Sequence, residues 1–235
     1  MASSSTRRLQ NDVIQYEDSS DRKILPNLYY VVRILMKPFI PRDDSRSKEN
    51  CAIAAKILAK SLSRTKAGND GKPLAVYCYE SEVYLLFSSL GVETAEHNLK
   101  GSHHGICSFY ASLAAREHLT LDVTCSIVEM DSRTKVLIYF QTKIHENVKR
   151  TVIALSNDKL SKKDIEHLTL GETLDMLSKV SGASTDVWKD TPPATKFGIF
   201  YKSVVTSEGK EKYAILSEKI DLNNMEKCSS YLFDA

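Results

Sequence analysis

Short apolar runs at strand-like spacing divide the first half of the chain. They predict four β-strands, at residues 28–36, 74–79, 82–87 and 121–130. Only Glu80 and Ser81 separate the second run from the third, so these two strands are expected to form a hairpin that turns at an acidic tip.

Two segments between these runs place apolar residues at helical spacing. Residues 47–62 predict an amphipathic helix, and residues 98–118 predict a segment that is mostly helical from Ile106 onward. The order strand, helix, strand, strand, helix, strand is that of the split βαβ unit. The sequence therefore predicts an α+β fold built on a ferredoxin-like, polymerase-type palm of βαββαβ order, with added helices and strands after it.

The second half of the chain begins with a long helical pattern. Its apolar positions recur at three- and four-residue steps from Val136 to Leu155, and Asp131 or Ser132 is placed to cap its start. Ser161 and Asp164 resemble a capping box that opens a shorter helix at 162–170. The remaining predicted elements are a loop at 184–195 and a closing hairpin formed by strands 196–205 and 212–220.

These elements suggest four parts along the chain. They are a flexible N-terminal segment at 1–20, a palm-like domain at 21–130, C-terminal helices and closing strands packed on the palm at 131–220, and a tail at 221–235.

Net charge, cysteine spacing and the length of the apolar runs limit the classes of protein that fit this sequence. The chain has 235 residues, 42% of them hydrophobic, and a net charge of only +2, which permits a local basic surface without a strongly basic protein. The five cysteines show no C-x-x-C spacing, which favours a reducing compartment over a disulfide scaffold. No apolar run approaches the roughly 18 residues that a membrane span requires. We expect a cytoplasmic protein with no membrane partner, although the Ser- and Arg-rich N-terminus also fits a short mitochondrial presequence.

Neither a P-loop nor a dinucleotide-binding glycine motif is present, so the hairpin acids are the best candidates for chemistry. In polymerase-like palms, one acid at the end of the first strand and another in the hairpin turn hold two divalent cations, because such cations need hard oxygen ligands. The hairpin offers Glu80 and Glu82, but the first strand ends in Leu35, Met36 and Lys37. A leucine cannot donate an oxygen, so the residues describe a palm that lacks its first metal ligand.

A series of motifs in a fixed order runs through most of residues 15–203. The motifs are YEDSSDRKILPNLYYVVRILMKPF (16–39), PRDDSRSKENCAIAAKIL (41–58), ESEVYLLF (80–87), HENVKRTVI (145–153), LTLGETLDML (168–177) and TKFGIFYK (195–202). Together they resemble the tRNA(His) guanylyltransferase family, the polymerases that add nucleotides in the reverse, 3′-to-5′ direction. The resemblance implies a divergent member of that family.

The resemblance also assigns roles to particular positions. The first metal-binding Asp of the family falls on Leu35, and the second falls on Ser81, between Glu80 and the retained Glu82. The resemblance thus implies that no catalytic residue set is intact. Positions with an expected nucleotide- or RNA-binding role lie on the long helix and after the first strand, and they are His145, Asn147, Lys149, Arg150 and Arg42.

Three functions fit these observations. The first is a non-catalytic paralogue of tRNA(His) guanylyltransferase, a pseudoenzyme without metal or nucleotide cofactor that serves as an RNA-binding or assembly subunit. Its partner would be tRNA or another RNA, a second copy, a paralogue in a mixed oligomer, or a larger ribonucleoprotein. The second is a divergent active tRNA 5′-end nucleotidyltransferase that uses Mg²⁺ and GTP, with Glu80, Glu82 and the pair Asp43 and Asp44 as replacement metal ligands. The third is a palm unrelated to tRNA.

Overall fold

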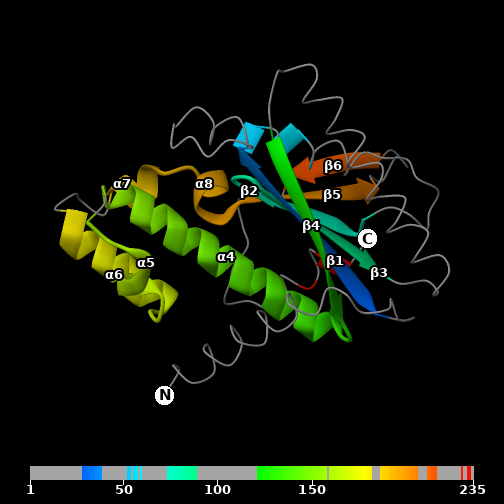
Figure 1. Cartoon of the computed structure of the whole chain (residues 1–235), viewed down its shortest axis with the longest axis horizontal. Helices are drawn as coiled ribbons and strands as arrows, with labels where there is room; N and C mark the ends of the chain where they lie inside the picture. The colour runs from blue at the N-terminus through cyan, green and yellow to red at the C-terminus, as the bar shows by residue number, and fades with distance from the viewer. Residues whose placement is uncertain are drawn as a thin grey trace.

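A computed structural model of the chain describes residues 28–38, 73–88, 121–157, 159–181, 186–205 and 211–215, together with single positions between 52 and 59 and near residue 232. Its centre is one six-stranded antiparallel sheet with the strand order β4-β1-β3-β2-β5-β6 (Figure 1). The strands span Tyr29–Pro38 (β1), Ala75–Tyr79 (β2), Glu82–Ser88 (β3), Leu121–Met130 (β4), Ile199–Val205 (β5) and Glu211–Ile215 (β6). The predicted α+β class and all four predicted strands of the first half are confirmed.

The hairpin predicted from the sequence is present. Tyr79 pairs with Glu82, and Glu80 occupies the turn with a positive φ of 44°, a conformation that a tight turn between antiparallel strands requires. β1 lies beside β3 and also beside β4, so the first four strands have the β4-β1-β3-β2 order that a split βαβ unit produces. Of the two helices predicted between these strands, 98–118 lies outside the described residues.

Alternation along the strands gives the sheet two buried faces. One face carries Ile34, Met36 and Val83, and it packs against Ala55 and Ala59, which are helical and fully buried. The described positions of the predicted helix 47–62 are therefore helical, with small residues against the sheet.

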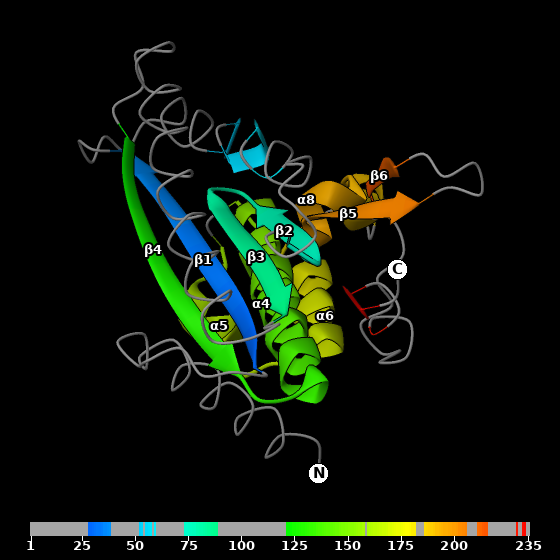
Figure 2. The same cartoon turned by 90° about the vertical axis from the view of Figure 1, so that its right-hand side faces the viewer.

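The other face of the sheet is covered by α4, Arg133–Leu155, which crosses the strands in Figure 2. Ser132 is its N-cap, and the Ser132 side chain accepts a hydrogen bond from the Lys135 amide nitrogen, as the sequence predicted. The apolar side of α4, including Val136, Phe140 and Ile144, joins Tyr77 in the core beneath it.

Further helices form a second layer on α4. They are α5 at Lys162–Ile165 and α6 at Leu170–Ser181, and their residues Ile165 and Leu177 pack against Val148 and Val152 of α4. The predicted capping box is confirmed, because Asp164 accepts a hydrogen bond from the Ser161 amide nitrogen at 2.7 Å.

Two predictions about this layer are wrong. The short helix ends at Ile165 rather than at residue 170, because the Thr169 amide donates to Glu172 at 2.8 Å and starts a new helix. The predicted loop at 184–195 contains α7, Asp186–Asp190, and the start of α8, Pro193–Phe197. Pro193 begins α8, because a proline fits the first turn of a helix, where its missing N–H is not needed.

The closing hairpin is confirmed as β5 and β6, with shorter bounds than predicted and with residues 216–220 outside the described part. β5 pairs with β2 through Val76 and Tyr201, so the closing strands extend the same sheet. No helix among the described residues is long and apolar enough to cross a membrane.

Candidate functional site

The two positions that the motif resemblance predicts for metal ligands, Leu35 and Ser81, lie next to each other in the structure. Leu35 pairs with Glu82 across β1 and β3, and the Met36 amide donates to the Ser81 carbonyl at 2.9 Å. Strand alternation turns Leu35 and Glu82 toward α4. The sheet therefore brings the backbones of these two positions together, with a hydrocarbon side chain at the first and a hydroxyl at the second.

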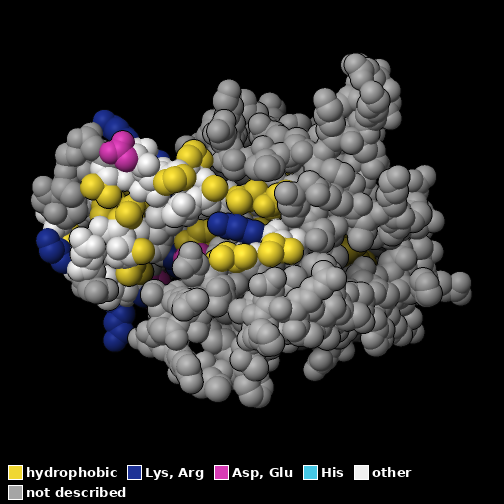
Figure 3. All heavy atoms as spheres, turned by 90° about the horizontal axis from the view of Figure 1, so that it is seen from above, with side chains coloured by type: hydrophobic (Ala, Val, Ile, Leu, Met, Phe, Trp, Pro, Cys, Tyr) yellow, Lys and Arg dark blue, Asp and Glu magenta, His cyan; other side chains and the backbone are white. Residues whose placement is uncertain are grey.

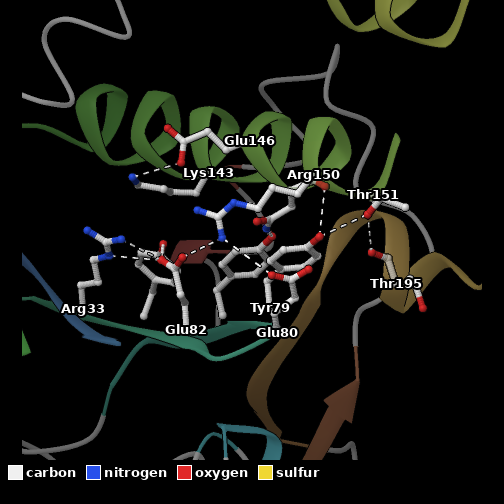
Figure 4. Close-up of polar contacts among 12 residues, drawn as sticks. Arg33, Tyr79, Glu80, Glu82, Lys143, Glu146, Arg150, Thr151 and Thr195 are labelled. Atoms are coloured by element: carbon white, nitrogen blue, oxygen red, sulfur yellow. Dashed lines mark hydrogen bonds and ion pairs between the residues drawn. The ribbon is translucent and has the colours of Figure 1, made fainter. Parts of the chain in front are cut away.

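Glu82 is the centre of this site and is almost fully buried, at 4% exposure. Its Oε2 accepts hydrogen bonds from Arg33 Nε at 3.2 Å and Nη2 at 3.0 Å, and from the Tyr84 hydroxyl. Its Oε1 accepts from Arg150 Nη1 of α4 at 2.7 Å (Figure 4). Both carboxylate oxygens are therefore bound by guanidinium groups from two different elements.

These contacts fix the charge of Glu82. Burial acts to raise its pKa, but the charge of Arg150, the Tyr84 hydroxyl and the charge of Arg33 outweigh burial and lower the pKa to about 2. The side chain is an anion at physiological pH, held by two cations.

The side chains that the structure describes at this site are not a suitable set of ligands for a divalent cation. Leu35 supplies no oxygen, and the oxygens of Glu82 are engaged by arginine. Glu80 is more accessible, with its side chain 54% exposed and its Oε2 3.9 Å from Arg150 Nη1. Within the described ranges no three His, Cys, Asp or Glu residues form a group that could hold a metal. Asp43, Asp44 and Arg42, which the sequence offered as replacement ligands and as a nucleotide contact, lie outside the described residues.

Asn147, a predicted nucleotide contact, lies in the interior at 4% exposure. Its Nδ2 donates to the Tyr77 hydroxyl, which in turn donates to the Phe197 carbonyl at 2.8 Å. The Asn147 side chain thus joins α4 to β2 and α8, and this geometry favours a structural role. His145 is half-buried, and burial together with the nearby Lys149 charge lowers the pKa of His145.

Lys149, a predicted RNA contact, and two other lysines donate hydrogen bonds to backbone carbonyls. Lys149 Nζ donates to the Glu166 carbonyl at 2.7 Å, Lys159 Nζ to the Val180 carbonyl at 3.2 Å, and Lys196 Nζ to the Lys189 carbonyl at 3.3 Å. Each acceptor lies at or near the C-terminal end of a helix, where unpaired carbonyls and the helix dipole favour a cation. On the face shown in Figure 3, the described Lys and Arg side chains are scattered among hydrophobic ones.

Two features of the site were not assigned from the sequence. The sequence predicts no role for Arg33, although this residue stands two positions before Leu35 and so shares the sheet face that Glu82 occupies. The second feature is a series of hydroxyl contacts that begins at Tyr79, the last residue of β2 before the hairpin turn. The Tyr79 hydroxyl lies 3.2 Å from Thr151 Oγ1, and Thr151 donates to the Thr195 carbonyl at 3.0 Å (Figure 4).

Known structures share this fold. The chain superimposes on a bacterial tRNA(His) guanylyltransferase-like protein in complex with ATP with a TM-score of 0.62 and 15% identity, covering 96% of this chain and 99% of that one. A bacterial protein of the same description in complex with GTP gives a TM-score of 0.58, 17% identity and the same coverage. No protein-family model and no curated protein sequence matches the chain. The resemblance predicted from the sequence motifs is confirmed at the level of the fold.

Proposed function

We propose that this chain, which has the fold of the bacterial tRNA(His) guanylyltransferase-like proteins, is a non-catalytic paralogue that acts as an RNA-binding or assembly subunit. In this proposal the strands β4-β1-β3-β2 are the polymerase-type palm, and the β2–β3 hairpin is retained as structure. The known fold by itself does not carry a function, so the proposal depends on the site.

The observation that carries the proposal is the binding of Glu82 by Arg33 and Arg150. In a working palm the hairpin acids bind cations that activate the attacking oxygen and neutralise phosphate charge. Here Arg150 Nη1 lies 2.7 Å from Glu82 Oε1, which is direct contact between α4 and the hairpin. A cation could bind this buried carboxylate only by displacing a guanidinium group, which is costly because it breaks an ion pair that balances the buried charge.

A nucleotide-addition assay tests the proposal. Purified protein should add no nucleotide to the 5′ end of tRNA in the presence of Mg²⁺ and GTP or ATP, while a bacterial tRNA(His) guanylyltransferase-like protein should do so in a parallel reaction. Calorimetry should show no Mg²⁺ binding in the millimolar range where weak carboxylate sites bind.

Mg²⁺-dependent addition by this protein would overturn the proposal and favour the active alternative. In that case Glu80→Gln should abolish the activity, because Glu80 is the one described hairpin acid with an accessible carboxylate. The variant Asp175→Asn, an exposed change on α6, serves as the control.

A further inference from the structure

Two buried tyrosine hydroxyls of β2 are bonded to α4. The Asn147 Nδ2 donates to the Tyr77 hydroxyl, and the Tyr79 hydroxyl lies 3.2 Å from both the Asn147 carbonyl oxygen and Thr151 Oγ1. The two tyrosines are two positions apart on a strand and their partners are four positions apart on a helix, so each pair lies on one face of its element. All four residues are buried, and we call them the polar ladder.

The polar ladder continues to the backbone of α8. The Tyr77 hydroxyl donates to the Phe197 carbonyl at 2.8 Å, and the Thr151 hydroxyl donates to the Thr195 carbonyl at 3.0 Å (Figure 4). Among the described residues, no buried side-chain nitrogen or oxygen is without a hydrogen-bond partner. A rotation or a slide of α4 would break these bonds and leave buried polar groups unpaired, which is costly. The polar ladder therefore constrains where α4 lies against β2.

The polar ladder lies directly beside the ion pair between Glu82 and Arg150. Tyr79 is paired with Glu82 across the hairpin, so their side chains leave the same face of the sheet. On α4, Arg150 lies one position before Thr151 and three positions after Asn147, and residues at this spacing share a helix face. The Arg150 side chain is 41% exposed, and holding so long a side chain in one conformation costs entropy. Its 2.7 Å contact with Glu82 thus depends on how α4 is placed against the hairpin.

The other described donors to Glu82 do not come from α4. Arg33 lies on β1, and Tyr84 lies on β3 itself, so the register of the sheet places both. Three further charged side chains belong to the hairpin and to α4. They are Glu80, 3.9 Å from Arg150 Nη1, and Lys143 and Glu146, which pair with each other at 3.3 Å. Of the described donors to the carboxylate, Arg150 is therefore the one whose position α4 decides.

We propose that Asn147 and Thr151 are positioning residues for this ion pair. By bonding the two tyrosines of β2, they fix the rotation of α4 about its axis and its position along the strand, and so bring Arg150 to Glu82. The inference rests on the proposed function only through this ion pair, so it can fail while the proposed function stands.

The pKa of Glu82 in the folded full-length protein tests the inference. Burial raises that pKa, and the charge of Arg150 is the largest of the influences that lower it to about 2. Carbon NMR of glutamate-labelled protein follows each carboxyl group separately, and the signal missing from Glu82→Gln assigns this one. Thr151→Val and Asn147→Leu each remove polar groups of the polar ladder at similar volume, and each should raise the pKa of Glu82 to about 3 or higher.

Tyr79→Phe removes the partner hydroxyl from the β2 side and should give the same rise if Thr151→Val fails to fold. Thr151→Ser keeps the hydroxyl and should leave the pKa of Glu82 at its native value. The matched control is Val152→Ala, which truncates a fully buried neighbour that packs on α5 and α6, and it should lower stability without moving this pKa.

An unchanged pKa of Glu82 in Thr151→Val, Asn147→Leu and Tyr79→Phe would overturn the inference, and so would an equal rise in Val152→Ala. Nucleotide addition by the native protein is a separate outcome, which would overturn the proposed function and leave the positioning of Arg150 as it is.

Discussion

At the scale of single residues, Glu82 shows how a buried acid at the end of a hairpin is held by the surrounding structure. The carboxylate stays buried because Arg33 and Arg150 balance its charge and Tyr84 fills a further acceptor site. A buried charge without such partners would shift its pKa and become neutral. Two guanidinium groups therefore supply the positive charge that balances this buried carboxylate.

This arrangement predicts an acid-dependent loss of stability. The pKa of Glu82 is lowered from 4.5 to about 2, so its stabilising contribution is complete above about pH 4.5 and is lost as the pH falls toward 2. We expect a loss of about 2–3 kcal/mol over this window, after a discount for the exposed side of Arg150. Urea denaturation at several pH values should show this decline in the native protein.

In the variant Glu82→Gln the decline between pH 4.5 and pH 2 should be much smaller, although the variant should be less stable at pH 7, where two arginines lose their anion. Glu80→Gln is the matched control on the same hairpin, and its pH dependence should stay close to that of the native protein. An unchanged slope in Glu82→Gln would contradict the ion-pair geometry.

Part of this site could be predicted from the sequence. The motif resemblance predicts Leu35 and Ser81 at the two ligand positions, and the strand register brings these positions together. The partners of Glu82 could not be identified, because Arg33 and Arg150 lie 49 and 68 residues away. The motif resemblance predicts a nucleotide contact at Asn147, and the motif position does not reveal that the side chain faces Tyr77.

At the scale of elements, strands and the long helix were predictable because their apolar periodicity is strong and local. α7 and α8 were not predicted, since each has only five residues and neither shows a full helical repeat. The end of α8 depends on a contact between residues far apart in the sequence. Gly198 follows the helix with a φ of 79°, and the Phe197 carbonyl accepts a hydrogen bond from the Tyr77 hydroxyl. The backbone can pass this close to Tyr77 only where no side chain intervenes.

Gly198→Ala should therefore be strongly destabilising. A Cβ atom at this position would lie 2.6 Å from the Tyr77 hydroxyl oxygen, and the positive φ strains any residue other than glycine. We expect a loss of about 2–4 kcal/mol in the free energy of unfolding, from the backbone strain and the displaced ring together.

The matched control is Gly171→Ala, because a Cβ there meets no atom within 4 Å and the residue lies in α6. That change should be neutral or stabilise the protein by up to about 1 kcal/mol. Thermal unfolding of both variants measures the difference. Equal stability of the two would show that the junction between α8 and β5 is not constrained as described.

At the scale of the whole molecule, the described basic side chains mostly stabilise the fold. Lys149 and Lys159 donate to carbonyls near helix ends, and Arg150 binds the hairpin. Charge reversal at Lys149 or Arg150 would thus disturb the fold and RNA binding together. Lys162 and Lys163 are exposed on α5, and neither amine has a partner among the described residues, so they are the better probes of an RNA surface.

If the molecule binds tRNA through this helical layer, Lys162→Glu combined with Lys163→Glu should weaken binding on the order of tenfold or more, because each lysine that pairs with a phosphate releases a counterion. The slope of log affinity against log salt should fall by up to about 2. The single change Lys56→Glu, at an exposed helical position on the opposite face of the sheet, measures the effect of one charge reversal away from this surface and is compared with Lys162→Glu alone. Circular dichroism of the variants should match that of the native protein, so that a loss of affinity is not a loss of folding. Absence of tRNA binding by the native protein even at low salt would exclude the RNA role and favour assembly with a protein partner.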